Sequence, residues 1–148
     1  DLVDFTPGEG FHVHRLTETE FRDLLELHLI LQLAALATAP NRLATPVSAD
    51  QPYPDRIADL FLAVADRSSN SEIVASIAAI GDRLQFSRHF DAAILGDVEA
   101  EYRLLEAAIV DAAPQTEMRS LLLGYHERRA RAATSYARTL AAHPGRQS

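Results

Sequence analysis

The ten residues 24–33 restrict the fold of this chain more than any other segment. They read Leu-Leu-Glu-Leu-His-Leu-Ile-Leu-Gln-Leu, so a helix here would carry apolar side chains on nearly every side. Thr17 and Glu20 precede the run with the spacing of a capping box, in which each side chain can accept a hydrogen bond from the other residue's backbone amide. We therefore expect a helix over 18–38 that is buried on several faces, at the centre of a bundle or at a subunit interface.

The remaining sequence alternates apolar stripes of helical spacing with breaks. Residues 40–54 contain four prolines and are expected to form a loop, and further breaks are expected at 68–71, at Gly96-Asp97 and at Pro114. Asn70 and Asp97 are suitable N-caps for the helices that follow. The stripe of Ile73, Ile77, Ile80 and Leu84 predicts a helix that reaches about Phe90. The stripes are Ile57, Leu60, Phe61 and Val64; Ile73, Ile77, Ile80 and Leu84; Val98, Tyr102, Leu105 and Ile109; and Met118, Leu122, Tyr125, Arg129, Ala132 and Tyr136.

The pattern predicts an all-α fold, an antiparallel bundle of five or six helices, with a β-hairpin in front of it. Residues 2–5 and 11–13 read as two short strands around a Pro/Gly turn. Two strands are marginal in water, so the hairpin is expected to belong to something larger. We divide the chain into the hairpin and linker (1–16), the helical domain (17–143) and a tail (144–148).

Charge and composition narrow the possible partners. The net charge of −7 argues against nucleic-acid binding by this chain alone, because phosphate contacts need a basic face. No apolar run approaches the roughly 20 residues that span a bilayer, so no membrane association is expected. The sequence contains no cysteine, which excludes disulfides and thiolate chemistry and fits a cytoplasmic location.

Three segments in the first 32 residues resemble a domain junction in bacterial GntR-type transcription regulators. They are Pro7-Gly-Glu-Gly-Phe-His-Val13, Leu16-Thr-Glu-Thr-Glu-Phe21 and Leu24-Leu-Glu-Leu-His-Leu-Ile-Leu-Gln32. In that family, specifically in its FadR subfamily, the wing of a winged helix-turn-helix leads into the first helix of an FCD-type effector domain. The segments 61–70, 101–109 and 124–128 are similar to later motifs of the same domain.

The resemblance implies a ligand-sensing and dimerisation domain of a DNA-binding transcription regulator. The expected partners are a second copy of the chain and a small-molecule effector, either an organic acid or a larger apolar ligand. DNA would be reached only through the winged helix-turn-helix, which is missing because the chain begins within the wing. The loop over 40–54 replaces a longer segment that usually contains another helix, so a less enclosed pocket is expected.

Members of this family typically hold a divalent metal with one Asp and three His. Their motifs fall here on Ala58, Leu62, Tyr102 and either Gly124 or Tyr125, none of which is a good ligand for such a metal. Asp59 and His126 lie one or two positions away, but one step along a helix turns a side chain by about 100°. We expect that the family's metal site has been lost and that no cofactor is bound.

Several candidate pocket residues have two possible roles. Arg129 could hold a carboxylate or phosphate, or could pair with an acid on a neighbouring helix or subunit. His28 is expected to be a hydrogen-bonded core histidine, whereas a displaced metal site using His89 or His126 stays open. The complete set of effector-pocket candidates is Ala58, Leu62, Tyr102, Tyr125, Arg129, His89 and His126.

Two other functions compete with effector sensing. The first is a constitutive dimerisation module without an effector, which a continuous core between the helices carrying Leu62, Tyr102 and Tyr125 would favour. The second is a helical-bundle enzyme. No Ser/His/Asp arrangement, glycine-rich phosphate loop or Glu-x-x-His pair occurs in the sequence, so we assign no catalytic residue and do not expect an enzyme.

Overall fold

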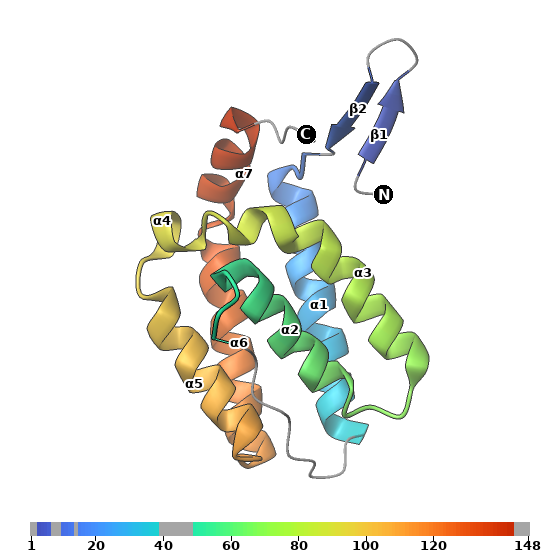
Figure 1. Ribbon diagram of the computed structural model, residues 1–148, viewed down its shortest axis with the longest axis vertical. Helices are drawn as coiled ribbons and strands as arrows, with labels where there is room; N and C mark the ends of the chain where they lie inside the picture. The colour runs from blue at the N-terminus through green and yellow to red at the C-terminus, as the bar shows by residue number, and fades with distance from the viewer. Residues whose placement is uncertain (1–2, 7–9, 14, 39–48, 144–148) are drawn as a thin grey trace.

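The computed structural model of this protein describes residues 3–6, 10–13, 15–38 and 49–143. Within these ranges the chain forms two strands and seven helices (Figure 1). The elements are β1 (Val3–Thr6), β2 (Gly10–Val13), α1 (Glu18–Thr38), α2 (Tyr53–Ala65), α3 (Ser71–Arg88), α4 (Asp91–Leu95), α5 (Val98–Val110), α6 (Gln115–Arg131) and α7 (Ala133–Ala142). The predicted helical bundle is confirmed, although the described part has more helices than expected.

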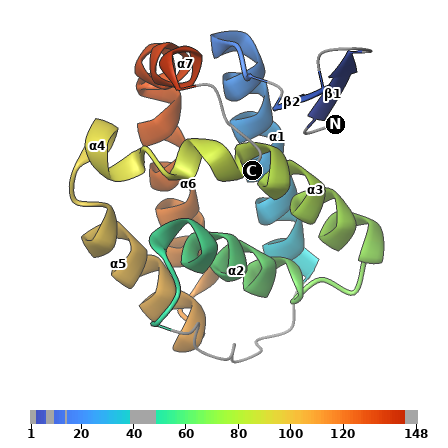
Figure 2. The ribbon, with the colours of Figure 1, turned by 45° about the horizontal axis from the view of Figure 1, so that its top comes forward.

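Helix α1 packs against α2, α3, α6 and α7, which explains its nearly uniform apolar sequence (Figure 2). Its N-terminal half shares a core with α3 and α7, in which Phe21 stacks on Tyr136 at 4.6 Å between ring centroids. Its C-terminal half adjoins a second core formed by α2, α5 and α6. One strip of α1 is uncovered, where Leu27 is 45% exposed and Ile30 is 54% exposed.

The predicted caps at Thr17 and Asn70 are confirmed. The Glu20 amide donates to Thr17 Oγ1 at 3.1 Å, and the Thr17 amide donates to Glu20 Oε2 at 3.0 Å. Asn70 Oδ1 accepts from the Glu72 amide at 3.0 Å. The prediction for Asp97 is wrong in its chemistry, because Asp97 has a left-handed backbone with φ of 36° and its side chain makes no capping hydrogen bond.

The two extra helices come from breaks that apolar spacing does not reveal. The expected helix to Phe90 ends at Arg88, and the expected last helix divides at Ala132. At both places the backbone switches to tighter bonds, from the Phe90 amide to the Ser87 carbonyl and from the Ala132 amide to the Arg129 carbonyl. The stripe through Tyr136 therefore continues across two helices.

The loop prediction over 40–54 is wrong at its end. Helix α2 already begins at Tyr53 and includes Pro54, with Pro52 at its N-cap. Proline suits the first helical turn because the amide it lacks has no intrahelical partner there. Residues 39–48 lie outside the described residues, as does the predicted tail from 144.

Strands β1 and β2 pair antiparallel, with Val3 opposite Val13 and Phe5 opposite Phe11. In Figure 1 they precede α1 at the end of the bundle where α7 finishes. The turn residues 7–9 are not among those described. None of the described helices is long and apolar enough to cross a bilayer.

Candidate functional site

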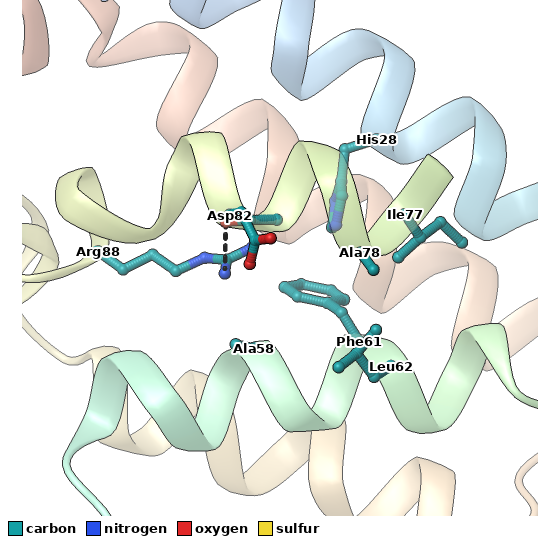
Figure 3. Close-up of a pocket in the computed structure, with 9 residues that line it drawn as sticks. His28, Ala58, Phe61, Leu62, Ile77, Ala78, Asp82 and Arg88 are labelled. Atoms are coloured by element: carbon teal, nitrogen blue, oxygen red, sulfur yellow. Dashed lines mark hydrogen bonds between the residues drawn. The ribbon is translucent and has the colours of Figure 1, made fainter. Parts of the chain in front are cut away.

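A small hollow lies between α1, α2 and α3 and opens partly to solvent (Figure 3). Its volume is about 50 Å³. Figure 3 shows His28 reaching in from α1, Phe61 from α2, and Arg88 from α3. We call it the α1–α2–α3 hollow. Its lining residues are His28, Ala58, Phe61, Leu62, Ile77, Ala78, Gly81, Asp82 and Arg88.

His28 belongs to a buried pair with His126, and their hydrogen bonds fix which ring nitrogens carry protons. His126 Nδ1 lies 2.7 Å from the Leu122 carbonyl oxygen, which can only accept, so His126 Nδ1 is the donor. In the neutral ring His126 Nε2 is then an acceptor, and His28 Nδ1, 2.8 Å away, must donate to it. His28 Nε2 is left as a bare acceptor.

Both rings of this histidine pair are held in the neutral form. Burial lowers the pKa of His126 to about 4, opposed by its bond to the Leu122 carbonyl and assisted by the positive charges of Arg129 and Arg88. Burial also lowers the pKa of His28 well below its usual value, and His126 and Arg88 lower it further. Neutral His28 Nε2 can therefore accept a hydrogen bond near pH 7.

His28 Nε2 is buried and has no hydrogen-bond partner among the described residues. One turn further along α1, Gln32 Oε1 is also buried without a hydrogen-bond partner among the described residues. The Nε2 atom of Gln32 donates to the Phe61 carbonyl at 3.3 Å. Leaving a buried acceptor unsatisfied costs about 1–3 kcal/mol. A molecule that donates a hydrogen bond into the hollow would remove that penalty at His28.

Arg88 places a buried positive charge at the same hollow. Its side chain is only 3% exposed, and Nη1 donates to Gln85 Oε1 at 2.9 Å and to the Gly81 carbonyl at 3.4 Å. Its guanidinium carbon lies 5.7 Å from the centroid of the Phe61 ring. No described carboxylate forms an ion pair with Arg88, which is unusual for a buried charge.

The structure brings only two of the predicted pocket residues to the hollow, Ala58 and Leu62 on α2. His126 lies behind His28 and contacts it instead of the hollow. His89 is exposed at the C-terminal end of α3, where its ring faces Phe86 at 6.3 Å between centroids. The prediction that His28 is a hydrogen-bonded core histidine is confirmed.

Arg129 pairs with acidic residues of neighbouring helices, which is the second of the two roles expected for it. Its Nη2 lies 2.9 Å from Asp91 Oδ2, and its Nη1 donates to the Tyr125 carbonyl at 3.0 Å. Glu101 Oε1 also lies 2.9 Å from Nη2, as an ion pair without hydrogen-bond geometry. With its side chain 2% exposed, Arg129 is committed to contacts within the bundle.

The region around Tyr102 and Tyr125 is filled. Both rings are buried, and Phe61 meets Tyr125 edge to face at 4.8 Å between centroids. Two small hollows among the described residues, one lined by Leu105 and one lined by Tyr125 and Arg129, measure about 10 Å³ each. A continuous core therefore surrounds Tyr102 and Tyr125, whereas the other two family positions, Ala58 and Leu62, line the α1–α2–α3 hollow.

The family's metal chemistry does not fit the side chains at the corresponding positions. Ala58 and Leu62 offer no ligand atom, and the Tyr102 hydroxyl donates to Glu106 at 2.6 Å. Across the part of the chain that the structure describes, no group of three His, Asp or Glu side chains could hold a metal ion. We derive no metal-dependent step.

Sequence reasoning missed Arg88 and Asp82 as residues lining the hollow. A signal for Arg88 was present, because Ile77, Gly81, Leu84 and Arg88 are spaced by four, three and four residues and so share one face of α3. The apolar members of that face alone do not indicate a polar site.

Comparisons with known proteins found no match, whether to a protein-family model, to a curated protein or to a solved structure.

Proposed function

We propose that this chain is the effector-binding and dimerisation domain of a bacterial GntR-type, FadR-subfamily transcription regulator that senses its effector without a metal. The motif order along the sequence and an all-helical bundle preceded by two paired strands support the assignment. On this proposal β1 and β2 correspond to strands of the wing, and the helical bundle itself does not contact DNA. The protein acts as a cytoplasmic homodimer.

The sensing role rests on one observation, that two buried polar groups at the α1–α2–α3 hollow are incompletely paired among the described residues. Arg88 is a buried cation without a described carboxylate partner, and His28 Nε2 is a buried acceptor without a donor. Both line one cavity, so a single small molecule could satisfy both. Such a molecule would bias the arrangement of two subunits if it bound one arrangement more tightly than the other.

Native mass spectrometry of the purified chain tests this proposal. We expect a dimer of twice 16.3 kDa, with a small organic molecule retained and no mass lost on chelator treatment. Arg88→Gln should lose the retained molecule, whereas Arg83→Gln on the same helix should keep it. A monomer without ligand, or a metal removed by chelator, would contradict the proposal.

A constitutive dimerisation module is the second candidate, because the core around Tyr102 and Tyr125 is closed. It predicts a dimer that carries no ligand and whose melting temperature no metabolite changes. Addition of small acids during thermal unfolding separates the two functions, since only an effector-binding domain is stabilised by mass action.

A further inference from the structure

The chemistry of the α1–α2–α3 hollow is specific enough to define a ligand class. This inference rests on the proposed function, because it takes the hollow as the effector site. Three residues with polar side chains line it: Arg88, Asp82 and His28, whose buried Nε2 accepts no hydrogen bond from a described residue. Each places a different demand on the molecule that binds.

The guanidinium of Arg88 favours an anionic group on the ligand. Its polar contacts are to the neutral acceptors Gln85 Oε1 and the Gly81 carbonyl, both made through Nη1, and no described carboxylate forms an ion pair with it, although Asp82 lines the same hollow. A guanidinium presents donors in a planar fork that matches a carboxylate. Phe61 covers the guanidinium on one side, where water would otherwise screen the charge.

The Nε2 atom of His28 favours a hydrogen-bond donor on the ligand. Its Nδ1 proton is committed to His126, so Nε2 can accept from a ligand but cannot donate to one. A plain carboxylate would satisfy Arg88 and would leave Nε2 unpaired. The ligand must therefore carry an N–H or O–H group as well as its anionic group.

The Asp82 carboxylate determines whether an N–H donor or an O–H donor on the ligand fits the hollow better. It is an exposed residue that lines the hollow, and no described side chain forms a hydrogen bond or ion pair with it. A carboxylate that lines the same hollow as a neutral acceptor favours a positively charged donor, because the hydrogen bond from an ammonium group to Asp82 joins opposite charges. A hydroxyl group is uncharged and has one proton, so it can donate to His28 Nε2 or to Asp82 but not to both.

The rest of the wall limits the size of the ligand. The other lining side chains are small or apolar, and about 50 Å³ corresponds to roughly three or four water molecules. We propose that the α1–α2–α3 hollow binds a small α-amino acid as its zwitterion, with the carboxylate on Arg88 and the ammonium group between His28 Nε2 and Asp82. Glycine and alanine match the space, with the alanine methyl group against the apolar wall.

Three probes of nearly equal shape test the proposal, because alanine, lactate and propionate differ only in an ammonium, a hydroxyl or a hydrogen at carbon 2. Each is titrated into the isotope-labelled full chain while amide shifts are followed by two-dimensional NMR. Alanine should shift amides of α1, α2 and α3 in a saturable way. We expect lactate to bind at least about tenfold more weakly, and propionate more weakly still.

Two variants separate the ends of the ligand. Arg88→Gln should abolish binding of all three probes. Asp82→Asn should weaken alanine by about tenfold and leave lactate unchanged, since only the ammonium group uses the charge. Arg83→Gln and Asp111→Asn serve as controls on α3 and after α5. If Arg88→Gln fails to fold, Asp82→Asn still tests whether the ammonium group is bound. That variant should fold, because Asp82 is exposed.

The outcomes distinguish this inference from the proposed function. If lactate or propionate binds as well as alanine and Arg88→Gln abolishes it, the amino-acid class is wrong and the effector site stands. If no probe shifts these helices and native mass spectrometry shows a dimer without ligand, both the amino-acid inference and the sensing role are overturned.

Discussion

His28 and His126 are two imidazoles joined by a 2.8 Å hydrogen bond inside the bundle. The chain of donors runs in one direction, from His28 through His126 to the Leu122 carbonyl. Protonation of His126 Nε2 would place two donors against each other across that bond. The hydrogen bond between the two rings therefore requires His126 to stay neutral.

Stability should consequently fall in mild acid. A histidine whose pKa is lowered by folding binds more protons in the unfolded state, so its contribution is complete above about pH 6.5 and is lost as the pH falls towards 4. For His126 the loss is on the order of 3 kcal/mol. Urea unfolding at a series of pH values between 7 and about 4 measures it.

Substitution of each histidine shows whether the buried pair causes this dependence. His126→Gln should flatten the pH profile, while His89→Gln should leave it unchanged because that ring is exposed. An equally steep profile in His126→Gln would assign the effect to other groups.

At the residue scale, the sequence predicted burial but not pairing. His28 lies in a run of leucines, so its place in the core could be predicted from its neighbours. Its partner could not, because 98 residues separate the two histidines. The same holds for Arg129, whose partner Asp91 lies 38 positions away on a short helix that apolar spacing does not reveal.

At the scale of single elements, the start of α1 depends on the reciprocal bonds of Thr17 and Glu20. Thr17→Ala removes the acceptor for the Glu20 amide and should lower the free energy of unfolding by about 0.5–2 kcal/mol. Chemical denaturation measures the change. Thr19→Ala is the matched control inside the first turn, and a loss as large in that variant would show that the cap is not the cause.

Two glycines should respond to alanine in opposite directions. Gly124 lies within α6, and an added Cβ would meet nothing within 4 Å, so Gly124→Ala should stabilise the protein by about 0.5–1 kcal/mol. Gly96 has φ of 67° and ψ of −176°, so Gly96→Ala should destabilise it by about 1–3 kcal/mol. Thermal unfolding of both variants gives the signs, and equal signs would contradict this account.

Helix positions were predictable because apolar spacing and caps are local properties of the sequence. The breaks before α4 and α7 were not, because they depend on where later contacts draw the chain. Asp91, buried at the start of α4, is held by the Tyr136 hydroxyl of α7 at 2.6 Å. A helix running straight through Phe90 is incompatible with the backbone turn observed there.

At the scale of the whole molecule, the carboxylate of Asp91 joins distant parts of the bundle. It accepts hydrogen bonds from Tyr53 of α2, Arg129 of α6 and Tyr136 of α7, while Arg129 also pairs with Glu101 of α5. Five helices thus meet around one buried charge pair. The sequence does not identify these partners, because it predicts only that Arg129 could pair with an acid and places Tyr136 in an apolar stripe.

Asp91→Asn should be among the most damaging single changes in this protein. It removes the main counter-charge of a buried arginine, for which a loss of about 3–5 kcal/mol is expected. Equilibrium unfolding in urea measures the loss, and Asp111→Asn, an exposed acid, should change stability by less than about 0.5 kcal/mol. A loss below about 1 kcal/mol for Asp91→Asn would mean that Glu101 alone sustains the charge.

The two described ends of the helical region meet in space, since Arg15 Nη1 donates to the Ala141 carbonyl at 3.4 Å. A pulling force applied through the segment before Arg15 would therefore reach α7 as early as it reaches α1. Whatever is joined to the start of this bundle is thereby mechanically connected to its last helix.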